Sequence, residues 1–199
     1  MDTREKLLQV ATRRFAESGF DGVSIAAIAD ELGLTKQALL HHFASKEKLY
    51  GQVLSRISDR FLAQLESGQE TGTTAAVRFE STMLDLHERA RSEEPETLIL
   101  MRELLDNRRR ADTAGAWYLK PFLETLVARL RELPGWQAAS PAEALATVYQ
   151  LLGAINYFAI SGPTLRNMFG DAHHVALVEA FPDSLRRQIR AAIANPPCP

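Results

Sequence analysis

Two short helix-forming segments separated by three residues constrain the fold of this chain more than any other feature. Apolar residues of segment 25–32 recur at the spacing of one helix face, and Ser24 before them is a favoured capping residue. A turn of Gly33, Leu34 and Thr35 follows, and Thr35 is suited to cap a second helix over about 36–43. Two short helices joined by a glycine-containing turn predict a helix-turn-helix unit.

The second of these segments has two different faces. At 100° per residue, Ala38, Leu39 and Phe43 share the face that we expect to pack in a core. The opposite face carries a polar set with one apolar member: Lys36, Gln37, Leu40 and His41. The polar side chains can donate to base edges or phosphates, and leucine can contact a thymine methyl group. The spacing alone also fits a solvated face on a plain helical hairpin.

Helical periodicity continues along nearly the whole chain, and no segment has a convincing period-two pattern typical of a strand. The sequence therefore predicts an all-α fold, with a first helix over about 3–17 that stops at Ser18–Phe20. The further helices are expected over these residues: 46–66 after a Ser45 cap, 75–91, 95–110, 117–133, 141–161 and 183–194. Pro121 is either a first-turn residue or a kink, and Ser140 with Glu143 predicts a capping box. We expect a helix-turn-helix domain over 1–48 and a helical domain over 49–199.

Composition narrows the class of protein. The 199 residues are 46% hydrophobic and 24% charged, which is enough apolar material for a sizeable core. Cys198 is the lone cysteine, so we expect no disulfide within the chain and no cysteine-based metal site. The charged N-terminus lacks an apolar signal core, and the densest apolar run, 151–160, is short of the roughly 20 residues of a membrane span. These features indicate a cytoplasmic protein with no cofactor and no metal.

The charge balance argues against general nucleic-acid coating. The formal net charge is −2, and residues 1–50 carry equal numbers of basic and acidic side chains. Any contact with nucleic acid must therefore depend on local placement of charge. Such a contact would be selective.

Residues 5–54 resemble the N-terminal domain of the tetracycline-repressor (TetR) family of bacterial transcription regulators. The resemblance rests on the order of elements and on the run "RRFAESGFDGVSIAAIADELGLTKQALLHHFASKEKLYGQVL", which begins at Arg13. It implies DNA contacts by six positions: Ser24, Thr35, Lys36, Gln37, His41 and Lys46. Leu40 stands where the family usually has a tyrosine, so a hydroxyl contact to phosphate is missing there. Gln37 stands where a small residue is common, which could add a base contact.

The C-terminal part predicts an assembly surface. The helix expected over 141–161 is apolar almost all round, so it must be covered on more than one side, and Gly153 with Ala154 would permit close approach of another helix. A final helix over about 183–194 carries Leu185, Ile189 and Ile193 and would complete a four-helix interface. The family resemblance supports a two-fold homodimer, whose two reading heads would bind a palindromic operator. A central core helix of a single subunit would show the same pattern.

A small-molecule pocket is a further hypothesis. The C-terminal helices mix bulky apolar and hydrogen-bonding groups, which such a pocket requires. The candidate ligand-binding residues are His87, Met101, Trp117, Phe122, Tyr149 and Asn156. His87 and Asn156 are favoured because a buried polar group needs a partner, although aromatic residues at this spacing are often ordinary core. The resemblance implies that an effector would move the two DNA-binding heads out of register with successive major grooves.

The sequence as a whole predicts a sequence-specific, DNA-binding transcriptional regulator. We expect a dimeric repressor that binds double-stranded operator DNA and is released by a small-molecule ligand. The alternative is a helical ligand-binding or adaptor protein that has lost DNA binding, which the neutral N-terminal charge and Leu40 leave open. We expect no enzyme, because the sequence has neither a glycine-rich phosphate loop nor a nucleophile elbow.

Overall fold

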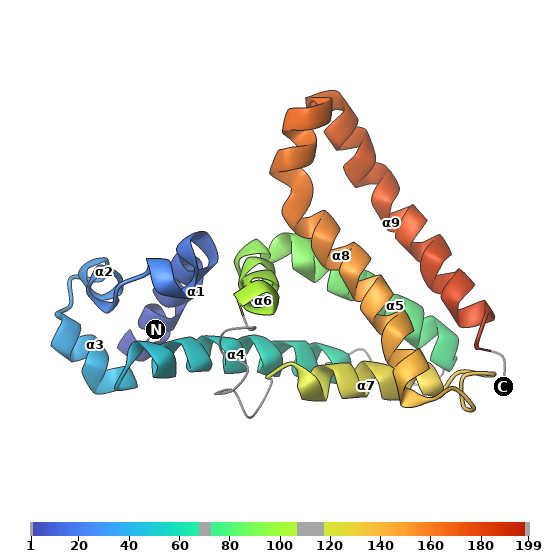
Figure 1. Ribbon diagram of the computed structural model, residues 1–199, viewed down its shortest axis with the longest axis horizontal. Coiled ribbons are helices and arrows are strands. Elements are labelled where there is room, and N and C mark those ends of the chain that lie inside the picture. The colour runs from blue at the N-terminus through green and yellow to red at the C-terminus, as the bar shows by residue number, and fades with distance from the viewer. Residues whose placement is uncertain (1, 68–72, 107–117, 198–199) are drawn as a thin grey trace. The chain divides into compact units, whose positions relative to one another are not determined.

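The computed structural model describes residues 2–67, 73–106 and 118–197, and every regular element in these ranges is a helix (Figure 1). The all-α prediction is confirmed. The chain forms two compact units: unit 1 contains Met1–Arg60 and Pro95–Tyr118, and unit 2 contains Phe61–Glu94 and Leu119–Pro199. The boundary expected after residue 48 stays a prediction. Trp117 and Cys198 lie outside the described residues.

Unit 1 is built from α1 (Thr3–Gly22), α2 (Ile25–Asp30), α3 (Lys36–Phe43), the first part of α4 (Lys46–Ser67) and α6 (Glu94–Asp106). The apolar stripes of these helices meet in one core. Its fully buried members include Leu7, Phe15, Ile28, Leu39, Leu49 and Ile57. The helix-turn-helix predicted from spacing is present as α2 and α3.

α1 continues past the glycine that was expected to end it. The helix runs to Gly22 but has a kink at Gly19, where the backbone has φ 71° and ψ 174°. A positive φ costs glycine little because it lacks a Cβ atom. Glycine therefore interrupts the regular geometry without ending the element.

Unit 2 contains the rest of α4, α5 (Ala75–Ser92), α7 (Lys120–Arg131), α8 (Pro141–Phe169) and α9 (Asp171–Ala194). α5 contacts α7, α8 and α9, and α8 contacts α7 and α9. After the turn at Gly170, α9 runs back alongside α8 (Figure 1). The Ser140–Glu143 capping box is present, and Pro121 lies in the first turn of α7.

The two C-terminal helices are longer than the sequence indicated. α8 ends at Phe169, where an end near Ser161 was expected, and α9 begins at Asp171, where a start near Asp183 was expected. Pro163 lies inside α8 and Pro182 inside α9. Proline disfavours a helix interior, but contacts between packed helices stabilise both segments beyond what propensity predicts.

The apolar part of α8 is longer than the run 151–160 that was identified from the sequence. By length and composition it is apolar enough to cross a membrane, with a mean hydropathy of 1.3 over its most apolar window, and among the described residues it is alone in this. The run 151–160 is only part of α8, which is one continuous helix of 29 residues. A single such helix is weak evidence for a membrane span, since apolar helices of soluble proteins pass the same test. The window is only 22% buried, so much of α8 remains to be covered by another surface.

Candidate nucleic-acid interface

Three side-chain caps fix the ends of the helix-turn-helix. Ser24 Oγ accepts a hydrogen bond from the Ala27 N–H at 3.0 Å, and Thr35 Oγ1 accepts one from the Ala38 N–H at 3.2 Å. Ser45 Oγ caps α4 in the same way. Ser24 and Thr35 act as acceptors in their caps, so their own hydroxyl hydrogens remain available for donation to a phosphate.

α3 separates its core and surface residues as predicted. Leu39 and Phe43 are buried in unit 1, with exposed fractions of 0% and 4%. Lys36, Gln37 and His41 are exposed. Two residues depart from the simple picture, because Ala38 and Leu40 are both half-buried. The exposed side of α3 therefore presents donors for bases or phosphates at its N-terminal end.

Some basic side chains of unit 1 are paired with carboxylates, and others are available to bind a polyanion such as DNA. Arg13 and Arg14 both pair with Glu31, and the distance from Arg14 Nε to Glu31 Oε2 is 2.8 Å. Lys36 and Lys48 make no ion pair with any carboxylate in the part of the chain that the structure describes. The net neutrality of the first 50 residues thus conceals an uneven surface.

The Lys46 ammonium group lies over an aromatic ring. Its Nζ lies 4.5 Å from the centre of the Phe20 ring, within the range of a cation–π interaction. The next residue, Glu47, is exposed, and its pKa lies below the usual range because it accepts hydrogen bonds from its own backbone N–H and from Ser45, with Lys46 adding to this effect. Glu47 therefore stays negative beside Lys46 and limits the positive charge at the start of α4.

Two residues, Arg4 of α1 and His42 of α3, were not singled out from the sequence. Arg4 donates to Gln52 Oε1 at 2.8 Å, and its guanidinium carbon lies 5.2 Å from the centre of the Phe43 ring at the end of α3. No local signal predicts this contact, because it joins residues about 40 to 50 positions apart in the chain. His42 is exposed next to His41. Its position directly after a predicted contact residue was the sequence feature that could have identified it.

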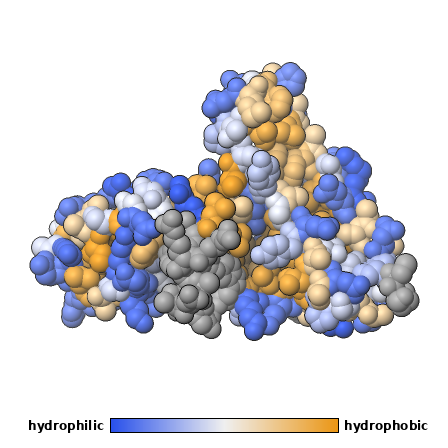
Figure 2. Space-filling view, in the orientation of Figure 1, coloured by the Kyte–Doolittle hydropathy of each residue, from blue (hydrophilic) through white to orange (hydrophobic). Residues whose placement is uncertain are grey.

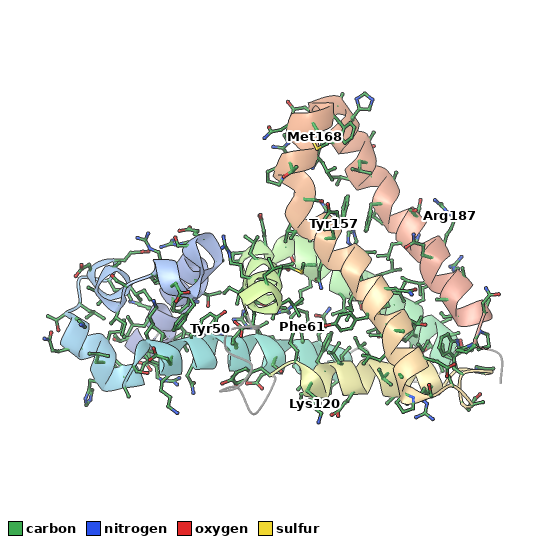
Figure 3. All side chains as sticks on the ribbon, in the orientation of Figure 1. Tyr50, Phe61, Lys120, Tyr157, Met168 and Arg187 are labelled. Atoms are coloured by element: carbon green, nitrogen blue, oxygen red, sulfur yellow. The ribbon has the colours of Figure 1, made fainter. Side chains whose placement is uncertain are left out.

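An aromatic cluster lies behind the helix-turn-helix. Tyr50 projects from α4 towards α1, where its ring centre lies 4.9 Å from that of Phe15 and 5.1 Å from that of Phe20 (Figure 3). The Tyr50 hydroxyl donates to Glu103 Oε2 of α6 at 2.7 Å. This hydrogen bond therefore joins α6, although distant in sequence, to α4 of unit 1.

Among the predicted ligand residues, His87 has the most unusual environment. It is 3% exposed, and neither ring nitrogen has a hydrogen-bond partner in the described part of the chain. The ring centres of Phe158 and Phe181 lie 5.9 and 5.1 Å away, and these two rings stack on each other. Burial lowers the pKa of His87, and the positive charge of Arg91 lowers it further.

The other predicted ligand residues do not converge on one place. Met101 belongs to unit 1, whereas Phe122, Tyr149 and Asn156 belong to unit 2. Phe122 is buried and packs against Phe61, with a ring-centre distance of 5.0 Å. Tyr149 is 49% exposed on α8, and Asn156 is half-buried. The structure therefore singles out His87 from this set.

The N-terminal part of the chain is similar to known proteins. Residues 7–53 match the family model described as bacterial regulatory proteins, tetR family. The chain is similar to the transcriptional repressor KstR2 of Mycolicibacterium smegmatis, with 34% identity over 71 residues, and to the transcriptional regulator RutR of Escherichia coli, with 39% identity over 67 residues. These matches cover 36% and 34% of this chain, and 35% and 32% of the relatives. The chain thus spans about a third of the length of the curated relatives that it matches.

Solved structures extend the likeness to the whole fold. A TetR-family transcriptional regulator from Bordetella parapertussis is similar with a TM-score of 0.68 and 19% identity, over 98% of this chain and 95% of that one. The fatty acid degradation regulator FadR from Bacillus halodurans is similar with a TM-score of 0.68 and 16% identity, over 93% of this chain and 95% of that one. At identities this low, the similarity establishes a shared fold and nothing more.

Proposed function

We propose that the protein is a sequence-specific, DNA-binding transcriptional regulator, because its residues 7–53 match the family model of the tetR bacterial regulatory proteins. The observation that carries the proposal is the division of α3, whose core residues are buried while Lys36, Gln37 and His41 are exposed. This division lies inside the segment that matches the family, residues 7–53. The names of the relatives describe regulators, which agrees with the expectation that the chain is not an enzyme.

α3 acts as the recognition helix in the major groove. Lys36 and Gln37 lie in its first turn, where base edges are nearest, and His41 reaches a base or a phosphate one turn later. Ser24 and Thr35 donate their hydroxyl hydrogens to phosphates while they cap their helices. Lys46 contacts a phosphate from the first turn of α4.

The active form is a homodimer that joins two copies through α8. One stripe of α8 packs inside its own chain: Ala144, Val148, Leu151 and Ile155. The opposite stripe is exposed and largely apolar: Leu145, Tyr149, Gly153 and Tyr157. Apart from the neighbouring residues of α8 itself, the described chain has no atom within 4 Å of a Cβ built on Gly153, so a partner helix can approach closely there. A second copy covers this stripe by isologous packing.

The contribution of α9 differs from the one expected. Leu185 and Ile189 are buried in their own subunit, so they are not exposed for contact with a partner. Apolar side chains instead gather where α8 meets α9 (Figure 2), and the exposed ones are Met168, Phe169, Val175 and Leu177. Tyr157 and Met168 are labelled on α8 in Figure 3. We assign this region to the homodimer together with the α8 stripe.

A small-molecule effector that releases the protein from a palindromic operator completes the proposed function. His87 is its favoured contact, because a buried imidazole with two unpaired nitrogens calls for a hydrogen-bonding partner. Met101, Phe122, Tyr149 and Asn156 remain further candidates. A regulator of this kind acts in the cytoplasm, where operator DNA is found.

The proposal is tested by binding of the purified protein to labelled DNA from beside its own gene. The binding is measured at two salt concentrations with excess unrelated competitor. We expect tight binding that survives the competitor and weakens with salt. Lys36→Ala should reduce the affinity, whereas Lys120→Ala, which removes an exposed lysine of α7 in unit 2, should leave it unchanged.

Binding that any DNA removes equally would overturn the proposal and favour a ligand-binding or adaptor protein. Equal loss in both lysine variants would show that general positive charge, not α3, holds the DNA. Circular dichroism of each variant confirms that the helices are retained.

A further inference from the structure

Arg102 of α6 holds the end of the straight part of α1. Its Nε donates to the Ala16 carbonyl at 3.0 Å, and one terminal nitrogen donates to the Glu17 carbonyl at 3.1 Å. These carbonyls lie just before Gly19, where the backbone leaves helical geometry. Carbonyls at the end of a helix lack intrahelical donors, and a positive charge is favourable at this end of the helix dipole. The guanidinium therefore serves as a side-chain cap supplied from another helix.

The next residue of α6, Glu103, is linked to the end of α1 through Tyr50. Glu103 accepts the hydrogen bond from the Tyr50 hydroxyl at 2.7 Å, and the Tyr50 ring packs on Phe15 and Phe20. Arg102 thus contacts α1 directly, whereas Glu103 holds Tyr50 of α4, whose ring packs on α1 on both sides of the bend. All of these residues belong to unit 1.

The bend leads directly to a residue of the proposed DNA interface. Phe20 follows Gly19, and its ring lies under the Lys46 Nζ at 4.5 Å. The position of the end of α1 therefore sets the position of the Phe20 ring, and this ring sets where the Lys46 ammonium rests.

We propose that Arg102 is a positioning residue for DNA binding, which fixes the end of α1 and, through Phe20, the place of the Lys46 ammonium. The inference rests on the proposed function. It adds a residue of α6, outside the segment that matches the family, to the machinery that places a phosphate contact.

The test is a double-mutant cycle on operator affinity with Arg102→Met and Lys46→Ala. If Arg102 acts through Lys46, each single variant should weaken binding by a similar factor and lower the salt slope by about one, and the double variant should be no weaker than the single ones. A merely structural role predicts losses that multiply, together with a lower melting temperature. Multiplying losses would overturn the proposal.

Arg60→Met is the matched control. Arg60 of α4 pairs with Glu96, which lies on α6 like Arg102, and Arg60 makes no hydrogen bond to α1 among the described residues. It should leave the salt slope unchanged, and a loss equal to that of Arg102→Met would contradict the proposal. If Arg102→Met does not fold, Arg102→Lys keeps the charge but not the paired donors, and should give the same cycle at smaller amplitude.

The two proposals fail in different ways. Wild-type protein that does not prefer its own operator over unrelated DNA contradicts the proposed function, and with it the role of Arg102. Specific wild-type binding with losses that multiply contradicts the role of Arg102 alone.

Discussion

The backbone N–H of Ser45 donates to the Phe43 carbonyl at 2.7 Å, so a three-residue turn centred on Ala44 joins α3 to α4. Ala44 has φ 62° and ψ −42°, and it is the one residue other than glycine with a positive φ in the described ranges. These angles and this hydrogen bond are typical of a γ-turn that is strained for a residue with a Cβ atom. Backbone strain is thus located at the end of the proposed recognition helix.

Ala44→Gly should raise the free energy of unfolding by about 1 kcal/mol, because glycine relieves strain worth about 1–3 kcal/mol at a small entropic cost. Urea unfolding followed by circular dichroism measures the change. Ala27→Gly, on exposed α2, is the matched control and should lower the stability by up to about 1 kcal/mol. A loss of stability in both variants would show that Ala44 is not strained.

Thr35→Ala should lower the free energy of unfolding by about 1 kcal/mol, because the Ala38 N–H loses its cap. Thr35→Ser keeps the acceptor and should retain most of the stability. The pair also separates the cap from the proposed DNA contact, since serine keeps the hydroxyl hydrogen as well. Operator affinity that falls in both variants would indicate that the threonine methyl group, and not the hydroxyl, matters to binding.

Leu40→Tyr should raise operator affinity about tenfold and steepen its dependence on salt. Leu40 is half-buried on α3, and a tyrosine hydroxyl at this position would add a hydrogen bond to a charged phosphate, worth about 1.5–3 kcal/mol before ordering costs. Titration of labelled operator at two salt concentrations measures both effects. Leu40→Phe supplies the ring without the hydroxyl, and an equal gain in that variant would assign the effect to apolar contact.

Local chemistry made much of unit 1 predictable. Ser24 and Thr35 cap N–H groups three residues away, so the signal and the structure lie in the same short window. The buried face of α3 follows from helical periodicity for the same reason. The contact of Arg102 with Ala16 joins residues 86 positions apart, and no local pattern encodes such a pairing.

The C-terminal helices were less predictable from the sequence. The helix boundaries expected near Ser161 and Asp183 lie inside α8 and α9, which continue through Pro163 and Pro182 because the packing of the two helices on each other outweighs the local preference. The candidate pocket residues were chosen by chemical type, which does not tell which helix faces meet. Met101 and Phe122 accordingly belong to different units.

His87 should make the stability of the protein depend on pH. Its pKa is lowered in the folded chain, chiefly by burial, so the folded state holds fewer protons on this group than the unfolded state. Stability is therefore fully present above the ordinary histidine pKa of about 6.5, and it is lost as the pH falls below that value. Urea unfolding at a series of pH values measures this loss.

His87→Phe is expected to flatten that profile, because phenylalanine does not titrate. It should also stabilise the protein by about 1–3 kcal/mol at neutral pH, since it removes two buried nitrogens without hydrogen-bond partners. His173→Gln, on exposed α9, is the control and should leave the His87 contribution in place. An unchanged profile in His87→Phe would place the pH dependence elsewhere.

Tyr157→Glu should convert the homodimer into monomers. Tyr157 is 69% exposed on the apolar stripe of α8, and an unpaired carboxylate buried there in a dimer costs about 3–5 kcal/mol for each copy. Sedimentation velocity should show a dimer for the wild type and a monomer for this variant, with weaker binding to a two-fold operator. Val77→Glu replaces an apolar residue of α5 that is 54% exposed, and it should remain dimeric. A dimeric Tyr157→Glu variant would show that the two copies meet on a surface other than the stripe of α8.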